Sequence, residues 1–225
     1  MRRSSLWLVV AVAWSPLVYA QSPPPAPLRV EQALQAKAPS DRANLRGFSV
    51  GVDPLVLGSL MSDYVTGGRA VNGLGLALRF GWGFSDRWTV LMDVAVTDLA
   101  VADSASYFLS HGDILMRWTP RTIEAARGTW APFVQAGLGF RDVSPFEASP
   151  TPERIYFLEG EVLTVGAGAA YFATPKLSLS AVFNWSTGKF NDERIGMVST
   201  HGRGLPGQSW RAGAGIHWHK GRRSP

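Results

Sequence analysis

The charged side chains that could do chemistry in this sequence stand at alternate positions among small residues. In "GLGLALRFGWGF", residues 73–84, Arg79 shares its parity with glycines and an alanine, while the even positions are bulky and apolar. Successive side chains of a β-strand point to opposite faces, so this period of two predicts a strand with Arg79 on its small-residue face. Six further charges stand on such faces elsewhere: Asp53, Asp93, Asp113, Arg117, Arg141 and Arg211.

These seven charges could form an ion pathway or a network of internal ion pairs. A charge inside a narrow, dry interior is costly unless it is paired. We therefore expect the seven to pair with one another and form a polar plug. A turn centred on Asp86 would place Arg79 opposite Asp93, at a Cβ separation of about 4.5–5.5 Å that permits an ion pair.

Two histidines are the candidates for a metal site. His217 and His219 share one strand face, as paired imidazole ligands do. A clear third ligand is missing nearby, and the sequence has no cysteine. We therefore predict no metal and no cofactor, and we expect the two histidines to line a polar mouth.

The elements that position these residues are eight stretches of alternating hydrophobicity. Each has one apolar face and one small or polar face; they are residues 47–53, 73–84, 88–98, 108–118, 132–141, 163–172, 176–185 and 209–219. Eight strands enclose a narrow lumen, so the bulky face must point outward into an apolar medium. Only a closed barrel satisfies the backbone of strands in a bilayer. The sequence therefore predicts an all-β fold, an eight-stranded antiparallel transmembrane β-barrel.

The links between these stretches differ in length. Residues 84–87, 119–129 and 173–176 are the shorter links, and residues 58–72, 98–107, 142–160 and 187–208 are the longer ones. Outer-membrane barrels have short periplasmic turns and long external loops. Pro54 lacks a backbone donor, so we expect a bulge or the end of a strand after Asp53.

The remaining segments indicate export. Arg2, Arg3 and the apolar run 6–14 predict a signal peptide over residues 1–20, removed after Sec-type export. A Pro-rich periplasmic leader is expected over 21–44, the barrel over 45–219 and a basic tail over 220–225. A formal net charge of +5 on an exported chain does not favour nucleic-acid binding.

Large aromatic residues cluster near the predicted strand ends, where a bilayer interface favours them. We expect them to form an aromatic girdle made of Trp82, Phe84, Trp88, Trp118, Trp130, Trp185, Trp210 and Trp218.

The last stretch carries a family pattern. Arg211, Gly213, Ile216 and Trp218 have the spacing of the signal that the barrel-assembly machinery recognises. Residues 45–219 resemble the small eight-stranded outer-membrane β-barrels of Gram-negative bacteria, of the outer membrane protein A type. The resemblance implies a bacterial outer-membrane location, contact with outer-membrane lipids and lipopolysaccharide, insertion by the barrel-assembly machinery, and a monomer.

The function expected from these features is non-enzymatic, either structural or surface-interacting, with a charge-plugged lumen. A narrow channel for small hydrophilic or ionic solutes is one alternative. A lipid-modifying enzyme is another, but the His-x-Ser pattern of outer-membrane lipid A deacylases does not occur here. Ser199 and His201 have the reverse order, in an expected external loop. We predict no catalytic residue.

Overall fold

The computed structural model describes residues 43, 45–101, 105–125, 127–145, 156–195 and 198–221. The expected signal peptide lies outside the described residues, and so do the expected leader except for Ala43, residues 222–225 of the tail and residues 146–155 of one long link.

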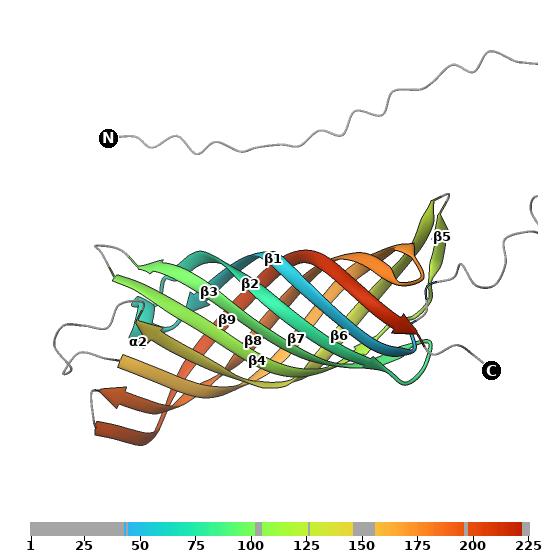
Figure 1. Cartoon of the computed structure of the whole chain (residues 1–225). Helices are drawn as coiled ribbons and strands as arrows, with labels where there is room; N and C mark the ends of the chain where they lie inside the picture. The colour runs from blue at the N-terminus through green and yellow to red at the C-terminus, as the bar shows by residue number, and fades with distance from the viewer. Residues whose placement is uncertain are drawn as a thin grey trace, which may run out of the picture. The chain divides into compact units, whose positions relative to one another are not determined.

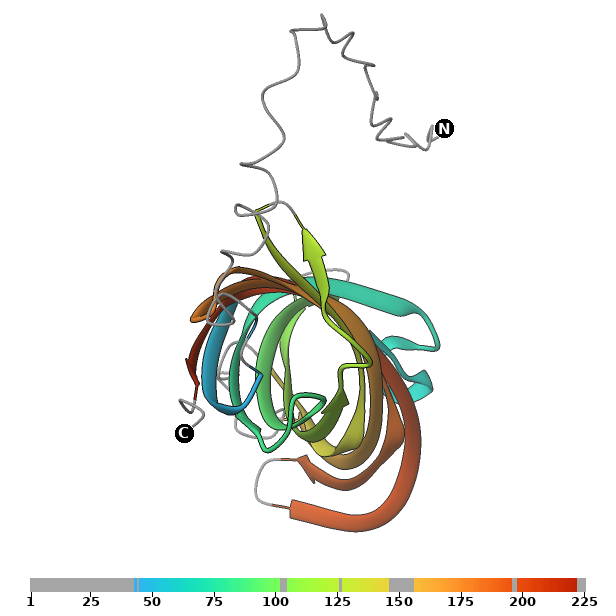
Figure 2. The same cartoon turned by 90° about the vertical axis from the view of Figure 1, so that its right-hand side faces the viewer.

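Eight long antiparallel strands of the described chain close into a barrel (Figures 1 and 2). Each strand pairs with its sequence neighbour, and the pairing of the last strand with the first completes the ring. The strands are β1 (Gly47–Met61), β2 (Ala70–Gly83), β3 (Trp88–Val101), β4 (Ala105–Trp118), β6 (Gly128–Pro145), β7 (Tyr156–Thr174), β8 (Leu177–Ile195) and β9 (Val198–Gly221). The predicted fold class is confirmed.

Two short elements mark the two ends of the barrel. The helical turn α2 (Asp63–Thr66) connects β1 to β2 at one end, and the short strand β5 (Ile123–Ala125) pairs with the start of β6 at the other (Figure 1). These ends are called the α2 end and the β5 end below. Within the described residues, no helix is long and apolar enough to cross a membrane.

Several strands run further toward the α2 end than the sequence predicts. β1 continues to Met61, and the expected loop over residues 187–208 is largely a hairpin of β8 and β9, in which Ile195 pairs with Val198. The backbone ladder continues there although the apolar alternation has ended. Hydrophobic alternation reveals a strand only where one of its faces meets an apolar medium. These extensions could therefore not be predicted from the alternation.

The irregularity expected at Pro54 is a β-bulge. The register of β1 shifts between Asp53 and Val56 against β2, and between Val52 and Leu55 against β9. Asp53 and Val56 are buried in the interior, while Pro54 and Leu55 are exposed. The extra residue therefore shifts the inward–outward alternation of β1 by one position after the bulge, while Asp53 keeps its inward position.

The interior is less polar than the sequence analysis expects, because two apolar clusters fill the lumen near its ends. The cluster toward the α2 end consists of Leu60, Leu99, Leu109, Val143, Leu158 and Phe190. The cluster toward the β5 end consists of Ala131, Phe133, Ala170, Phe172 and Val182, with Ala43 and Leu45 packed against it. The buried charges, beside which the small apolar cluster of Val56, Ala77 and Ala95 packs, thus lie between two larger apolar clusters.

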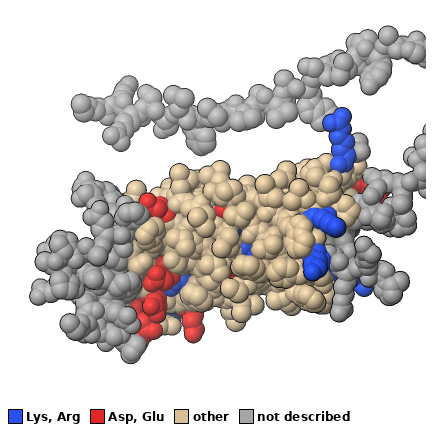
Figure 3. Space-filling view, in the orientation of Figure 1, with Lys and Arg blue, Asp and Glu red and all other residues tan. Residues whose placement is uncertain are grey.

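The outer surface is apolar over most of the barrel's length. Leu138, Ile114 and Phe140 are 70%, 66% and 63% exposed. In Figure 3, most charged side chains gather at the two ends, with acidic residues at the left and basic residues at the right. An uncharged band between two charged rims fits a lipid bilayer better than water.

The inward and outward faces should respond differently to truncation. Leu99 is fully buried in the cluster at the α2 end, so Leu99→Ala should lower the free energy of unfolding by about 2–5 kcal/mol. Leu138→Ala is the matched control on the outer face and should cost much less. Urea unfolding of the detergent-folded barrel measures both, and equal losses would contradict the assignment of the two faces.

Candidate functional site

The structure places the seven predicted charges on the inner face of the barrel. Arg117 is partly buried, and the other six have exposed fractions of 3% or less. They come from six strands: β1, β2, β3, β4, β6 and β9. Because all seven stand at inward-facing positions of their strands, the closed barrel brings together residues that are distant in the sequence.

Arg79 links three adjacent strands. It lies opposite Asp93 in the β2–β3 register, as predicted, and its Nε donates to Asp93 Oδ1 at 3.2 Å. Its Nη2 forms a second ion pair with Asp53 Oδ2 of β1, at 2.5 Å. The cation is thus shared by two carboxylates.

Arg211 reaches across the lumen from β9. It forms a short ion pair with Asp113 of β4, and its Nη2 lies 3.8 Å from Asp93 Oδ2. The hydroxyl of Thr164, on β7, donates to Asp113 Oδ1 at 2.9 Å. Asp53, Arg79, Asp93, Asp113 and Arg211 are therefore one network, the central charge cluster, which ties opposite walls of the barrel together.

Arg117 and Arg141 do not join this cluster, so the expectation that all seven charges pair with one another is wrong. Arg117 Nε donates to Gln135 Oε1 at 3.0 Å, and its guanidinium lies 3.7 Å from the Phe133 ring centroid. Arg141 donates to Ser209 Oγ at 3.3 Å and to the carbonyl oxygen of Gly207 at 3.1 Å.

The Arg141 guanidinium also lies 4.3 Å from the centroid of the Phe190 ring. Cation–π contacts and neutral acceptors replace carboxylates for these two cations. Among the described residues, neither has a carboxylate within ion-pair distance. Three aspartates are too few to pair with all four arginines, and alternation alone does not reveal which arginines lack a carboxylate.

Two amide side chains, which are not among the residues predicted from the sequence, extend the network. Gln135 Nε2 donates to Asn184 Oδ1 at 2.7 Å, and Asn184 Nδ2 lies 3.4 Å from Asp93 Oδ2. The chain of contacts runs from Arg117 through both amides to the central charge cluster. Both residues stand at positions of the alternation that face inward, and this could have identified them from the sequence. They were missed because a neutral amide does not stand out as a charge does.

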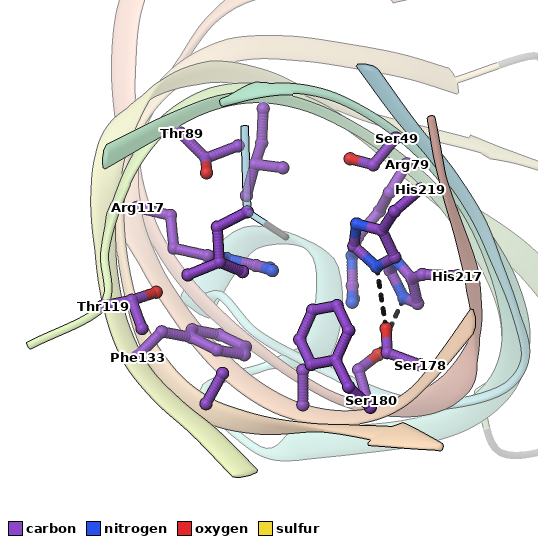
Figure 4. A pocket seen from close by; sticks show the side chains of 15 residues that line it. Ser49, Arg79, Thr89, Arg117, Thr119, Phe133, Ser178, Ser180, His217 and His219 are labelled. Carbon is purple, nitrogen blue, oxygen red and sulfur yellow. Dashed lines mark hydrogen bonds between the residues drawn. The ribbon is translucent and has the colours of Figure 1, made fainter. Parts of the chain in front are cut away.

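The two candidate histidines contact serines of β8 near the β5 end (Figure 4). A hydrogen bond of 2.7 Å joins Ser180 Oγ to His217 Nε2, and one of 2.9 Å joins Ser178 Oγ to His219 Nε2. Asp53 Oδ1 lies 3.2 Å from the same Nε2 of His217. In a catalytic triad the carboxylate and the hydroxyl bind different ring nitrogens, so this trio lacks that arrangement.

The metal site and the Ser199–His201 pair are the remaining candidates from the sequence. Within the described residues, no three His, Asp or Glu side chains are placed to hold a metal ion. Ser199 and His201 fall in β9 rather than in a loop, because the β8–β9 hairpin extends past them. Among the described residues, the inner-face groups form ion pairs, hydrogen bonds and cation–π contacts.

Comparisons with known proteins agree with this architecture. Neither protein-family models nor curated proteins match the sequence. Among solved structures, neisserial surface protein A aligns with a TM-score of 0.56 at 16% identity, over 76% of this chain and 96% of that chain. The chain has the fold of the small outer-membrane β-barrels.

Two other solved structures of this kind match with lower scores. Outer membrane protein OprG from Pseudomonas aeruginosa aligns with a TM-score of 0.47 at 13% identity, over 80% of this chain and 99% of that chain. Ail, the attachment invasion locus protein of Yersinia pestis, aligns with a TM-score of 0.46 at 14% identity, over 76% and 99%.

In this barrel the eight residues of the predicted girdle lie on the outer surface. Trp88 and Trp118 lie beside each other at the β5 end, with ring centroids 6.3 Å apart. Trp185 and Trp210 pair in the β8–β9 ladder. The expectation that these two end their strands is wrong, because β8 runs on to Ile195 and β9 begins at Val198.

The four residues with the assembly spacing lie in β9, the strand that closes the barrel against β1. Arg211 points inward into the central charge cluster, while Ile216 and Trp218 are 50% and 43% exposed on the outer face. Their recognition by an assembly machinery remains a prediction. Arg211 also has a structural role, as the cation that crosses the lumen.

Coupling within the central charge cluster can be measured with a double-mutant cycle. Arg79→Met should lower the free energy of unfolding by about 3–5 kcal/mol, because it removes the cation that the buried Asp53 and Asp93 share. Asp93→Asn should cost less, because Arg79 keeps its ion pair with Asp53. The double variant should lose clearly less than the sum.

The exposed pair Arg46–Asp86, whose side chains are 52% and 74% accessible, is the matched control. Removing either partner there should cost about 0–1 kcal/mol. Additive losses for Arg79 and Asp93 would show that their contact contributes no coupling energy.

Proposed function

We propose that the chain is an integral protein of the bacterial outer membrane, without enzymatic activity, whose lumen is closed by internal charges. Its role is structural, or is carried out at the cell surface. The observation that carries the proposal is the inverted distribution of polarity, with buried Asp53, Arg79 and Arg211 inside and apolar side chains such as Leu138 outside.

The interior favours a plug over a pore. Inside the central charge cluster, the cavity bordered by Arg79, Asp93 and Arg211 has a volume of about 10 Å³. That volume is about enough for one water molecule. An apolar cluster covers this layer toward the α2 end. Toward the β5 end, Phe133 and Phe172 border a cavity of only about 30 Å³. The described interior thus supports a lumen that does not conduct.

The location and partners follow from the same distribution. The apolar band would contact outer-membrane lipids, and lipopolysaccharide in the outer leaflet. Short connections at the β5 end support a periplasmic position for that end, with the α2 end outside the cell. The barrel-assembly machinery would insert the chain, and a closed barrel leaves no strand edge that requires a second copy.

Conductance in a planar bilayer tests the closed lumen. The purified barrel should give no stepwise current, because ion pairs and apolar clusters block the interior. Folding is checked on the same sample by comparing unboiled with boiled protein on a gel, since a closed barrel resists detergent until it is heated. Discrete single-channel steps from folded protein would favour the narrow channel instead.

Lipid A mass spectrometry tests the enzymatic alternative. Cells with and without the gene should have identical lipid A, since Ser180 is buried and its histidine lacks the triad arrangement. An acyl chain lost only in cells that contain the gene would overturn the non-enzymatic assignment.

Arginine on the outer face tests the membrane contact. Leu138→Arg should destabilise the barrel in lipid vesicles by about 2–4 kcal/mol, because its charge would lie near the bilayer midplane. Thr122→Arg, on the exposed connection between β4 and β5, should have little effect. Equal tolerance of the two changes would contradict the orientation of β6.

A further inference from the structure

Arg117 is a cation in the barrel interior that has no described counter-charge. Asp53 and Asp93 bind Arg79, and Asp113 binds Arg211. Arg117 has one hydrogen bond, to the neutral amide of Gln135, and its Nη2 is buried without a partner. The Gln135 amide and the Phe133 ring that contact this guanidinium carry no net negative charge, so an anion from elsewhere would stabilise it further.

A cavity of about 30 Å³ lies beside this guanidinium at the β5 end (Figure 4). Its lining combines Arg79, Arg117, His217 and His219 with five hydroxyl residues, and it contains no carboxylate. Arg79 is 97% buried, and its Nη1 is a second donor without a partner. The lining thus supplies hydrogen-bond donors and positive charge but no negative charge, and these are the groups that bind an anion.

We propose that this cavity binds one small monovalent anion, of halide size, as the counter-ion of Arg117. The volume holds about two water-sized particles, which excludes phosphate esters and larger carboxylates. Phe133 and Phe172 border the same cavity and keep its dielectric low, which strengthens the attraction between the ion and the guanidinium. The ion completes the neutralisation of the interior that the three aspartates begin.

Thermal unfolding of the folded barrel in detergent micelles tests the proposal. The unfolding temperature in sodium bromide is compared with that in sodium gluconate at equal ionic strength. Gluconate is too large for the cavity, and equal ionic strength holds screening constant. Bromide should raise the unfolding temperature along a saturable curve, by about 2–4 °C at roughly five times its dissociation constant. Arg117→Gln should abolish the rise.

Arg141→Gln is the matched control. Arg141 is likewise stacked on a phenylalanine and lacks a described carboxylate, but it does not line this cavity. The bromide effect should persist in Arg141→Gln. Persistence of the effect in Arg117→Gln would show that bromide acts without this guanidinium, and loss of the effect in Arg141→Gln would show that the effect is not specific to this cavity. Either result would overturn the proposal.

Thr89→Asp tests the site without removing the cation. Thr89 lies directly opposite Arg117 in the β3–β4 register, as Asp93 lies opposite Arg79 in the β2–β3 register. A carboxylate there should supply the missing counter-charge, raise the unfolding temperature in gluconate and remove the bromide effect. A bromide response unchanged from that of the parent chain would overturn the proposal even if Arg117→Gln failed to fold.

Discussion

Closure of the barrel between β1 and β9 is the constraint on which the rest of the structure depends. Strands in a bilayer must satisfy every backbone group within the sheet, and only a closed ring leaves no edge. Eight strands make a ring too narrow to hold bulky side chains from every inward position. Most large apolar groups therefore face outward, and the inward faces combine small residues, a few long polar ones and the apolar clusters near the two ends.

The interior resolves this constraint in layers. The central charge cluster occupies the middle, and an arginine stacked on a phenylalanine flanks it on each side, Arg117 on Phe133 and Arg141 on Phe190. Each of these rings belongs to an apolar cluster. The two arginines thus form the boundary between the charged middle and the apolar ends, since a guanidinium can donate from its edge and stack on its face.

The same layers explain why the inner-face groups act as a structural network. Arg79 is fixed between two carboxylates, and Arg211 connects β9 to β4 across the lumen. His217 contacts both Ser180 and Asp53 through one nitrogen, so it connects strands without the geometry of a proton relay. Gly51 leaves room for that imidazole, because a Cβ at this position would overlap its ring.

The sequence by itself determined the strand periodicity, the outward apolar face, an irregularity after Asp53 and the register that places Arg79 opposite Asp93. These features are local, since they follow from alternation along one strand or from one tight turn.

The tertiary structure decided which charges meet across the lumen, as Arg211 and Asp113 do. It also decided that Leu60 and Leu99 form an interior cluster and that Arg117 is left without a carboxylate. Contacts across a closed barrel depend on the stagger of all eight strands, and alternation along a single strand does not specify that stagger.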